Sequence, residues 1–199
     1  MTSQQLTLDP ATTALVLIDL QNGIVAMNVF PQTSAEVVER SRQLAQAFRA
    51  ANAQVVMVTV ANLPDGKDAL QPLADAMPPA GAPRPANWAI QVDALAPQTG
   101  DLQIVKRQWG AFYGTELDLQ LRRRGIRTIV LAGISTNVGV ESTARDAFER
   151  GYQQVFVADA MASPSAEAHA NTLKFTFPAL VARAPRRKCL APLARDSPS

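Results

Sequence analysis

The chain has 199 residues, of which 47% are hydrophobic, and its formal net charge at neutral pH is +2. This length and composition suffice for one substantial hydrophobic core, so we expect a single domain over residues 1–199 with a frayed tail from about residue 185. The basic residues are dispersed apart from two short clusters without aromatic neighbours, and no apolar run approaches the roughly 20 residues of a membrane span. We therefore expect neither nucleic acid nor a membrane as a partner.

The chain has only one cysteine, Cys189, and one histidine, His169. The single cysteine rules out an internal disulfide framework, and the single histidine leaves too few ligands for a zinc site. We expect no metal and no cofactor. The first residues lack the basic segment and the apolar core of a signal peptide, which predicts a cytoplasmic protein.

The first third of the chain alternates strand, helix and strand patterns. Residues 14–20 form a continuous apolar run typical of a buried strand, and Asp19 comes at its carboxyl end. Thr33 and Glu36 form a capping box that predicts the start of a helix, and residues 54–60 predict a second strand. A strand–helix–strand order favours a parallel sheet.

Residues 62–100 differ from the segments on either side. They are rich in Pro, Ala and Asp and show no periodicity, and a connection of this length is usually functional or mobile. We interpret the segment as a surface excursion over the ligand crevice. It would bring Trp88 either into the crevice or into a subunit contact.

The next predicted strand is short and ends in a lysine. Residues 103–106 form this strand, with Lys106 at its carboxyl end, and a stretch rich in glycine and aromatics follows. Its aromatic residues suit a pocket wall and a packed core or interface about equally: Trp109, Phe112 and Tyr113. Thr115 and Gly125 then mark the two ends of a predicted helix.

The strongest strand-to-helix pattern runs from residue 127 to residue 150. Residues 128–132 predict a strand buried on both faces, Gly133 ends it, and Ser135 and Thr136 are candidate N-caps of a helix. The residues expected on the inner side of this helix are Val138, Ala144, Ala147 and Phe148. Such a turn places unpaired backbone N–H groups at the carboxyl edge of the sheet, where open α/β folds bind ligands.

Three further elements complete the predicted fold. Residues 154–158 predict a strand that Asp159 closes, and a helix follows from Ser163 to about Phe175. Residues 179–183 predict a final edge strand. The sequence contains no internal repeat, in keeping with one domain.

Three of the predicted strands deliver polar groups to the same edge of the sheet. Asp19 comes from the first strand, Lys106 from the short one, and the turn at 133–139 from the fourth. A carboxylate and an ammonium in one cleft each favour the charged form of the other, whereas burial opposes both charges. This edge is therefore the predicted functional site.

Three stretches of the chain resemble the isochorismatase-like hydrolases: LVLIDLQNG from residue 15, the block from Lys106 to Tyr152, and DAMASPSAEAH from residue 159. The resemblance extends over about residues 14–183. It implies a Rossmann-like three-layer α/β/α fold with a six-stranded parallel sheet, and a homodimer or higher homo-oligomer. Most members of that family hydrolyse C–N bonds with an Asp–Lys–Cys triad, whose first two residues match Asp19 and Lys106.

The third triad position departs from this pattern. The sequence has Gly139 where the cysteine hydrolases of the family have their nucleophile, and glycine cannot supply the thiolate that a thioester mechanism needs. The true isochorismatases also carry glycine there and hydrolyse a vinyl ether without a covalent intermediate. The resemblance therefore implies a hydrolase that acts on a small, anionic molecule. Asp19 would be its general acid, with Lys106 and Gly139 beside it.

We expect a small-molecule substrate to be bound by side chains around this edge and by the backbone N–H groups near Ser135 and Gly139. The candidate substrate-binding residues are Gln21, Trp88, Trp109, Phe112, Tyr113, Ile134, Ser135, Thr136 and Val138. The resemblance also implies a cis peptide bond between Ile134 and Ser135.

Two other functions remain compatible with the sequence. The first is a catalytically inactive family member that binds a small ligand or serves as an oligomeric scaffold. The second is a cysteine amidase, which requires the tail to fold back and bring Cys189 into the crevice. Asp65 and Asp68 lack the Asp–His spacing of the metal-binding nicotinamidases of the family, and His169 is assigned a packing role.

Overall fold

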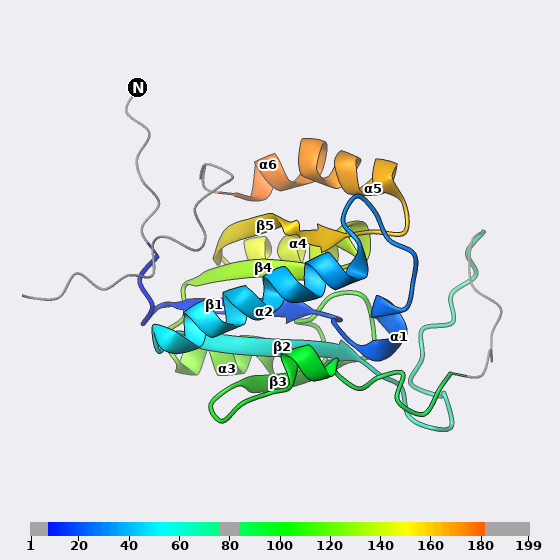
Figure 1. Cartoon of the computed structure of the whole chain (residues 1–199), viewed down its shortest axis with the longest axis horizontal. Coiled ribbons are helices and arrows are strands. Elements are labelled where there is room, and N and C mark those ends of the chain that lie inside the picture. The colour runs from blue at the N-terminus through cyan, green and yellow to red at the C-terminus, as the bar shows by residue number, and fades with distance from the viewer. Residues whose placement is uncertain (1–7, 76–83, 182–199) are drawn as a thin grey trace, which may run out of the picture.

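The computed structural model describes residues 8–75 and 84–181. Within these residues the centre of the fold is a sheet of five parallel strands in the order β3-β2-β1-β4-β5 (Figure 1). The strands are β1 (Thr13–Ile18), β2 (Gln54–Val60), β3 (Leu102–Lys106), β4 (Thr128–Ile134) and β5 (Gln153–Ala162). The predicted α/β fold with a parallel sheet is confirmed.

Helices cover both faces of the sheet. α2 crosses one face, whereas α3 and α4 lie on the other (Figure 1). The helices are α1 (Asn22–Val25), α2 (Ser34–Ala50), α3 (Leu117–Arg123), α4 (Glu141–Glu149), α5 (Ala166–Asn171) and α6 (Phe177–Leu180), with a 3-10 turn η1 (Asp93–Leu95) and the π-helical segments η2 (Thr136–Val140) and η3 (Thr172–Thr176). In the described part of the chain, none of these helices has the length and apolar composition needed to cross a membrane.

The strands form because their residues are apolar on both faces. All six residues of β1 are buried, as a strand between two helical layers requires. Leu15 and Leu17 pack in the hydrophobic cluster under α2, whereas Val16 and Ile18 pack in the cluster on the side of α3 and α4. This alternation along one strand produces three layers, α/β/α.

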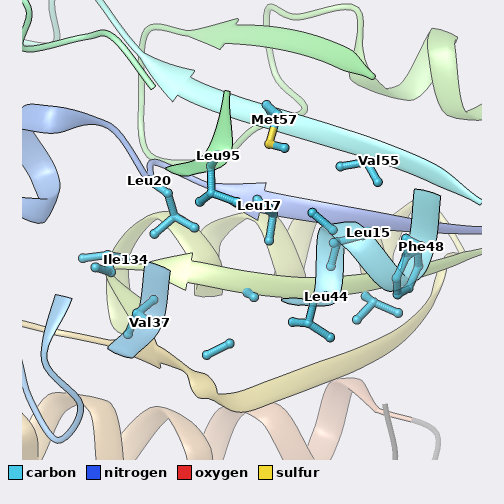
Figure 2. Packing of buried hydrophobic residues seen from close by; sticks show 14 of the residues in the cluster. Leu15, Leu17, Leu20, Val37, Leu44, Phe48, Val55, Met57, Leu95 and Ile134 are labelled. Atoms are coloured by element: carbon cyan, nitrogen blue, oxygen red, sulfur yellow. The ribbon is translucent and has the colours of Figure 1, made fainter. Parts of the chain in front are cut away.

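Helix α2 begins at the predicted capping box. Thr33 accepts a hydrogen bond from the backbone N–H of Glu36, and the Glu36 carboxylate accepts one from the Thr33 N–H at 2.8 Å. Val37, Leu44 and Phe48 recur on one side of the helix and pack onto the sheet residues shown in Figure 2. The apolar spacing thus determines which side of α2 faces the sheet.

The sheet has five strands in the described residues rather than the predicted six. Residues 179–180, expected in a final edge strand, belong to helix α6, and Val181 follows it outside any strand. The Phe177 ring stacks on Phe156 of β5 with 3.8 Å between the centroids, which keeps this segment in the helical layer. The rest of the predicted strand, and the tail with Cys189, lie outside the described residues.

Three predicted strand ends are wrong. The first strand, predicted over residues 14–20, ends at Ile18, so Asp19 and Leu20 follow it. Gly133 does not end β4, because it pairs with Ile18 of β1 and the strand continues to Ile134. A Cβ at Gly133 would lie 2.1 Å from the Ile18 carbonyl oxygen, and its φ is +128°, so this close approach of two backbones needs glycine. Strand β5 likewise continues past Asp159 to Ala162 through an irregularity in its pairing with β4.

The helical segment after β4 begins with a π-helical turn, η2, which runs directly into α4. Ala144 and Ala147 face the core as predicted, but Phe148 is 51% exposed, so the predicted inner side is wrong at that position. The wider π turn rotates the face that the following residues present. The next helix, α5, begins at Ala166 with Ser165 as its N-cap, so the predicted helix start at Ser163 is wrong.

Candidate active site

The carboxyl edge of the sheet carries a buried ion pair. Asp19 follows β1 in the left-handed region, with a φ of 53°, and Lys106 is the last residue of β3. The Lys106 Nζ lies 2.7 Å from Asp19 Oδ2, and only 1% of the lysine side chain and 8% of the aspartate side chain are exposed. The structure thus brings together the two side chains that the strand pattern predicts at one edge.

Burial and charge act on Asp19 in opposite directions. Burial raises the pKa of its carboxyl from 3.8 to about 6, against the lowering effect of Lys106. Lys106 occupies Oδ2, whereas the buried Oδ1 has no hydrogen-bond partner among the described residues. The Lys106 Nζ also donates to the Trp109 carbonyl oxygen at 2.6 Å. The site therefore holds a carboxyl group whose pKa is raised to about 6 and whose Oδ1 is left unpaired by the described residues.

Gly139 forms the third side of this centre. It lies in η2, and a Cβ built on it would lie 3.0 Å from Asp19 Oδ2, 3.0 Å from Ile18 Cγ2 and 3.1 Å from Lys106 Nζ. These distances are shorter than the optimal separation of non-bonded atoms, so a side chain at position 139 would press against the ion pair. Asp19, Lys106 and Gly139 meet at one place, as the sequence predicts.

The turn between β4 and η2 holds backbone groups next to the pair. Its Ile134–Ser135 peptide bond is cis, which confirms what the family resemblance implies. The Ser135 carbonyl oxygen accepts hydrogen bonds from the N–H groups of Val138 and Val140, each at 3.2 Å. Ile134 and Thr136 are fully buried, and Val138 is partly buried. The turn is thus packed into the core while its backbone lies at the edge that carries the ion pair.

The segment from β5 to α5 contacts this turn from the side. Thr136 Oγ1 and His169 Nδ1 lie 2.8 Å apart, and both side chains are buried. Burial also lowers the pKa of His169, so its ring is neutral at neutral pH. Ser163 Oγ donates a hydrogen bond to Asn137 Oδ1. His169 therefore has the packing role predicted for it, with a hydrogen bond to the turn in addition.

Gln21 and Trp88 join the excursion to the loop that follows Asp19. The fully buried Gln21 amide donates to the carbonyl oxygens of Val60 and Trp88 at 3.0 and 3.3 Å, and its Oε1 accepts from the Val60 N–H at 2.8 Å. The Trp88 ring covers Gly23, where a Cβ would lie 1.9 Å from the ring. The segment of the excursion around Trp88 is thus held against α1.

The three aromatic residues after Lys106 do not share one environment. Phe112 is 3% exposed in the cluster on the side of α3 and α4, with its ring tilted against Tyr152 at 5.7 Å between the centroids. Trp109 and Tyr113 are 60% and 75% exposed. Phe112 thus belongs to the core. Trp109 lies beside the ion pair, because its backbone carbonyl oxygen accepts a hydrogen bond from Lys106 Nζ.

Thr143 contacts both halves of the site, although the sequence pattern does not single it out. Its buried hydroxyl donates to the Gly139 carbonyl oxygen at 2.7 Å and accepts from the Ala111 N–H at 3.1 Å. The spacing of four residues between Thr143 and Gly139 is a sequence signal for the first bond. The second bond joins residues 32 positions apart, so no local pattern predicts it.

An open depression lies at the opposite end of the strands. Its volume is about 430 Å³, and its lining includes Asn52, Arg124 and the ion pair between Arg49 and Asp101, whose atoms are 2.6 Å apart. It shares no residue with the centre around Asp19. Because open α/β sheets bind ligands at the carboxyl ends of their strands, the Asp19 edge is the candidate active site.

The chain is similar to known proteins along most of its length. It matches the isochorismatase domain over residues 13–184. It is 52% identical over 174 residues to the isochorismatase family protein YwoC of Bacillus subtilis, with 87% of this chain and 89% of that protein covered. It is 35% identical over 185 residues to the ureidoacrylate amidohydrolase RutB of Methylorubrum extorquens, with 76% of this chain and 70% of that protein covered. A solved structure of an isochorismatase family protein from Burkholderia thailandensis has a TM-score of 0.87 at 46% identity, covering 94% of this chain and 97% of that chain. The chain therefore belongs to the isochorismatase family of hydrolases.

Proposed function

We propose that this protein hydrolyses a small, anionic molecule at the Asp19 edge, with Asp19 as general acid and without a covalent intermediate. The observation that carries the proposal is a buried carboxyl with a pKa of about 6, paired with Lys106 beside the bare backbone of Gly139. A general acid works best when its pKa lies near the operating pH. Membership of a hydrolase family supports hydrolysis, and the buried pair supports proton transfer as its chemical step.

Gly139 is the reason for proposing a mechanism without a thioester. The cysteine hydrolases that this chain resembles have their nucleophile at this position, and the one cysteine of the chain is Cys189. A covalent route needs an activated nucleophile within reach of the substrate, and glycine presents only backbone. The space of a side chain at 139 is bounded by the carboxylate of Asp19 and the ammonium of Lys106. We infer that water is the nucleophile.

In this proposal Oδ1 of Asp19 delivers the proton. Oδ2 is bound to Lys106, whereas Oδ1 has no partner among the described residues. With a pKa of about 6, roughly one tenth of the carboxyl groups carry a proton at pH 7. For a vinyl ether, this proton goes to a carbon of the double bond, and the resulting oxocarbenium-like cation takes up water. The Asp19 carboxylate receives the proton that the water releases, and the adduct then breaks into a carbonyl compound and an alcohol.

Lys106 and the turn after β4 would support the charges of this reaction. Once Asp19 has lost its proton, the Lys106 ammonium at 2.7 Å stabilises the carboxylate. The helical segment formed by η2 and α4 begins at this edge, and we propose that its first N–H groups hold a carboxylate of the substrate. A bound anion also favours the protonated form of Asp19, which is the form that the reaction needs.

The Asp19→Asn variant tests the acid role. Asparagine tolerates the left-handed φ of 53° and keeps the shape of the side chain, but it has no carboxyl proton to donate. We expect vinyl-ether hydrolysis to fall by at least about a hundredfold. Asp9→Asn, at an exposed carboxylate that precedes β1 and so lies toward the amino ends of the strands, should keep the wild-type rate. An unchanged rate in Asp19→Asn excludes the acid role.

A panel of small anionic vinyl ethers, amides and carbamates tests the reaction class. Turnover of the vinyl ethers alone supports proton transfer without a covalent intermediate. If no compound is turned over and one of them raises the melting temperature, the alternative function of a ligand-binding family member is favoured. Amide turnover that thiol alkylation abolishes would instead support a reaction at Cys189.

A further inference from the structure

Thr143 uses both hydrogen-bonding functions of its hydroxyl inside the protein, and the proposed reaction gives it no role. It is the third residue of α4 and is fully buried. The hydroxyl donates to the Gly139 carbonyl oxygen at 2.7 Å, as helical threonines commonly do toward the residue four positions earlier. It also accepts the N–H of Ala111 at 3.1 Å, and Ala111 belongs to a different loop. This second bond is the one that local helix geometry does not explain.

The loop that contains Ala111 lies directly on α4. A Cβ built on Gly110 would lie 3.4 Å from Asp146 Oδ2 and 3.7 Å from the Ser142 carbonyl oxygen. Ala111 itself is fully buried, so its N–H has no access to bulk water. A buried backbone N–H without an acceptor is costly, and the Thr143 hydroxyl supplies that acceptor.

The two bonds of Thr143 connect the two segments that flank the ion pair. Lys106 Nζ donates to the Trp109 carbonyl oxygen at 2.6 Å, and Ala111, two residues further along this loop, donates to Thr143. Thr143 donates to the carbonyl of Gly139, where a Cβ would lie only 3.0 and 3.1 Å from the two charged groups. The loop that orients the ammonium and the turn that bounds the carboxylate are thus joined through one hydroxyl.

We propose that Thr143 is a positioning residue, whose hydroxyl sets the distance between the loop orienting Lys106 and the turn carrying Gly139. It thereby sets the contact between Lys106 and Asp19. The inference rests on the proposed role of Asp19 as general acid. Its test, however, is a titration that needs no substrate.

The test compares Thr143→Val and Thr143→Ala with Thr143→Ser. Valine keeps the volume and loses the hydroxyl, and serine differs from alanine by the hydroxyl alone. The readout is the pKa of Asp19 from the carboxyl carbon signal of ¹³C-aspartate-labelled protein, assigned by its loss in Asp19→Asn. Lys106 is the charged group that lowers this pKa. We expect the pKa to rise by about 0.5 to 1 pH unit in the two hydroxyl-free variants, because Lys106 is then less closely held, and to stay at the wild-type value in Thr143→Ser.

Two results would overturn the proposal. The first is a set of superimposable Asp19 titration curves in all four proteins, with wild-type circular dichroism. The second is loss of folding in both hydroxyl-free variants, because Thr143 would then be required for the fold as a whole. Full turnover by Asp19→Asn would refute the general acid while leaving the titration result intact, so the two failures are distinguishable. Once a substrate is known, the pH profile of kcat should shift in the same order of variants.

Discussion

At the scale of single residues, the chemistry of the site comes from where the fold places Asp19. An aspartate in water titrates near pH 4, whereas burial at the end of β1 raises this pKa to about 6 and Lys106 limits the rise. The absence of a side chain at Gly139 leaves room for the ion pair, because a Cβ there would press on both charged groups. An acid, an amine and a glycine therefore lie in direct proximity at this edge of the sheet.

Replacing Lys106 by methionine tests this balance of burial and charge. Methionine retains a flexible apolar chain but has no ammonium, so we expect the pKa of Asp19 to rise further above about 6. A carbon-detected NMR titration of the Asp19 carboxyl measures the change. Lys67→Met is the matched control, because Lys67 is 85% exposed and lies 3.9 Å from Asp65. An Asp19 titration that is the same in Lys106→Met and in the wild type would contradict the assignment.

At the scale of elements, the site depends on a turn that is held from two sides. On one side, the hydroxyls of Thr172 and Thr176 donate to Glu141 at the start of α4, at 2.6 and 3.2 Å, and His169 contacts Thr136. On the other side lies the loop after β3. Segments distant in sequence thus hold η2 in its π-helical form, which is frequent at functional sites.

The Thr136→Val variant tests the contact with α5. Valine fills the same volume but leaves His169 Nδ1 buried without its partner at 2.8 Å. We expect the free energy of unfolding in urea to fall by about 1 to 3 kcal/mol. Thr136→Ser keeps the hydroxyl and removes only a methyl group, so its free energy of unfolding should fall by less than that of Thr136→Val. Equal stability of the valine and serine variants would show that the hydrogen bond contributes nothing.

At the scale of the whole molecule, the acid of the site is expected to lower stability at neutral pH. Folding raises the pKa of Asp19 from 3.8 to about 6, so the native state binds this proton more tightly than the unfolded chain does. The stability linked to the proton is fully present below pH 3.8 and is lost as the pH rises through about 6. A shift of this size corresponds to about 3 kcal/mol.

Urea unfolding at several pH values tests this expectation. We predict that the free energy of unfolding declines between pH 4 and pH 7 more steeply in the wild type than in Asp19→Asn, which has no carboxyl proton to lose. The difference between the two curves is the relevant quantity, because His169 titrates in both proteins. Its lowered pKa acts in the opposite direction, with stability lost as the pH falls. Parallel curves would refute the linkage to Asp19.

Local sequence by itself determined most of the elements and the two charged groups of the site. The apolar runs of β1, β2 and β4 predict buried parallel strands, and the capping box at Thr33 predicts the start of α2. Asp19 is recognisable because it directly follows β1, which is buried on both faces, and Lys106 is recognisable as the charged last residue of the short strand β3. These features depend on neighbouring residues in the chain, which a pattern can represent.

Only the tertiary structure decided the contacts between distant segments. Residues 179–180, predicted as part of a strand, are helical, and the nearby Phe177 stacks on Phe156. Strand β4 extends beyond its predicted end because Gly133 approaches Ile18 closely. The raised pKa of Asp19 and the two bonds of Thr143 likewise belong to the folded chain. Each of these depends on a distance through space and on exclusion of water, and neither quantity is contained in the order of the residues.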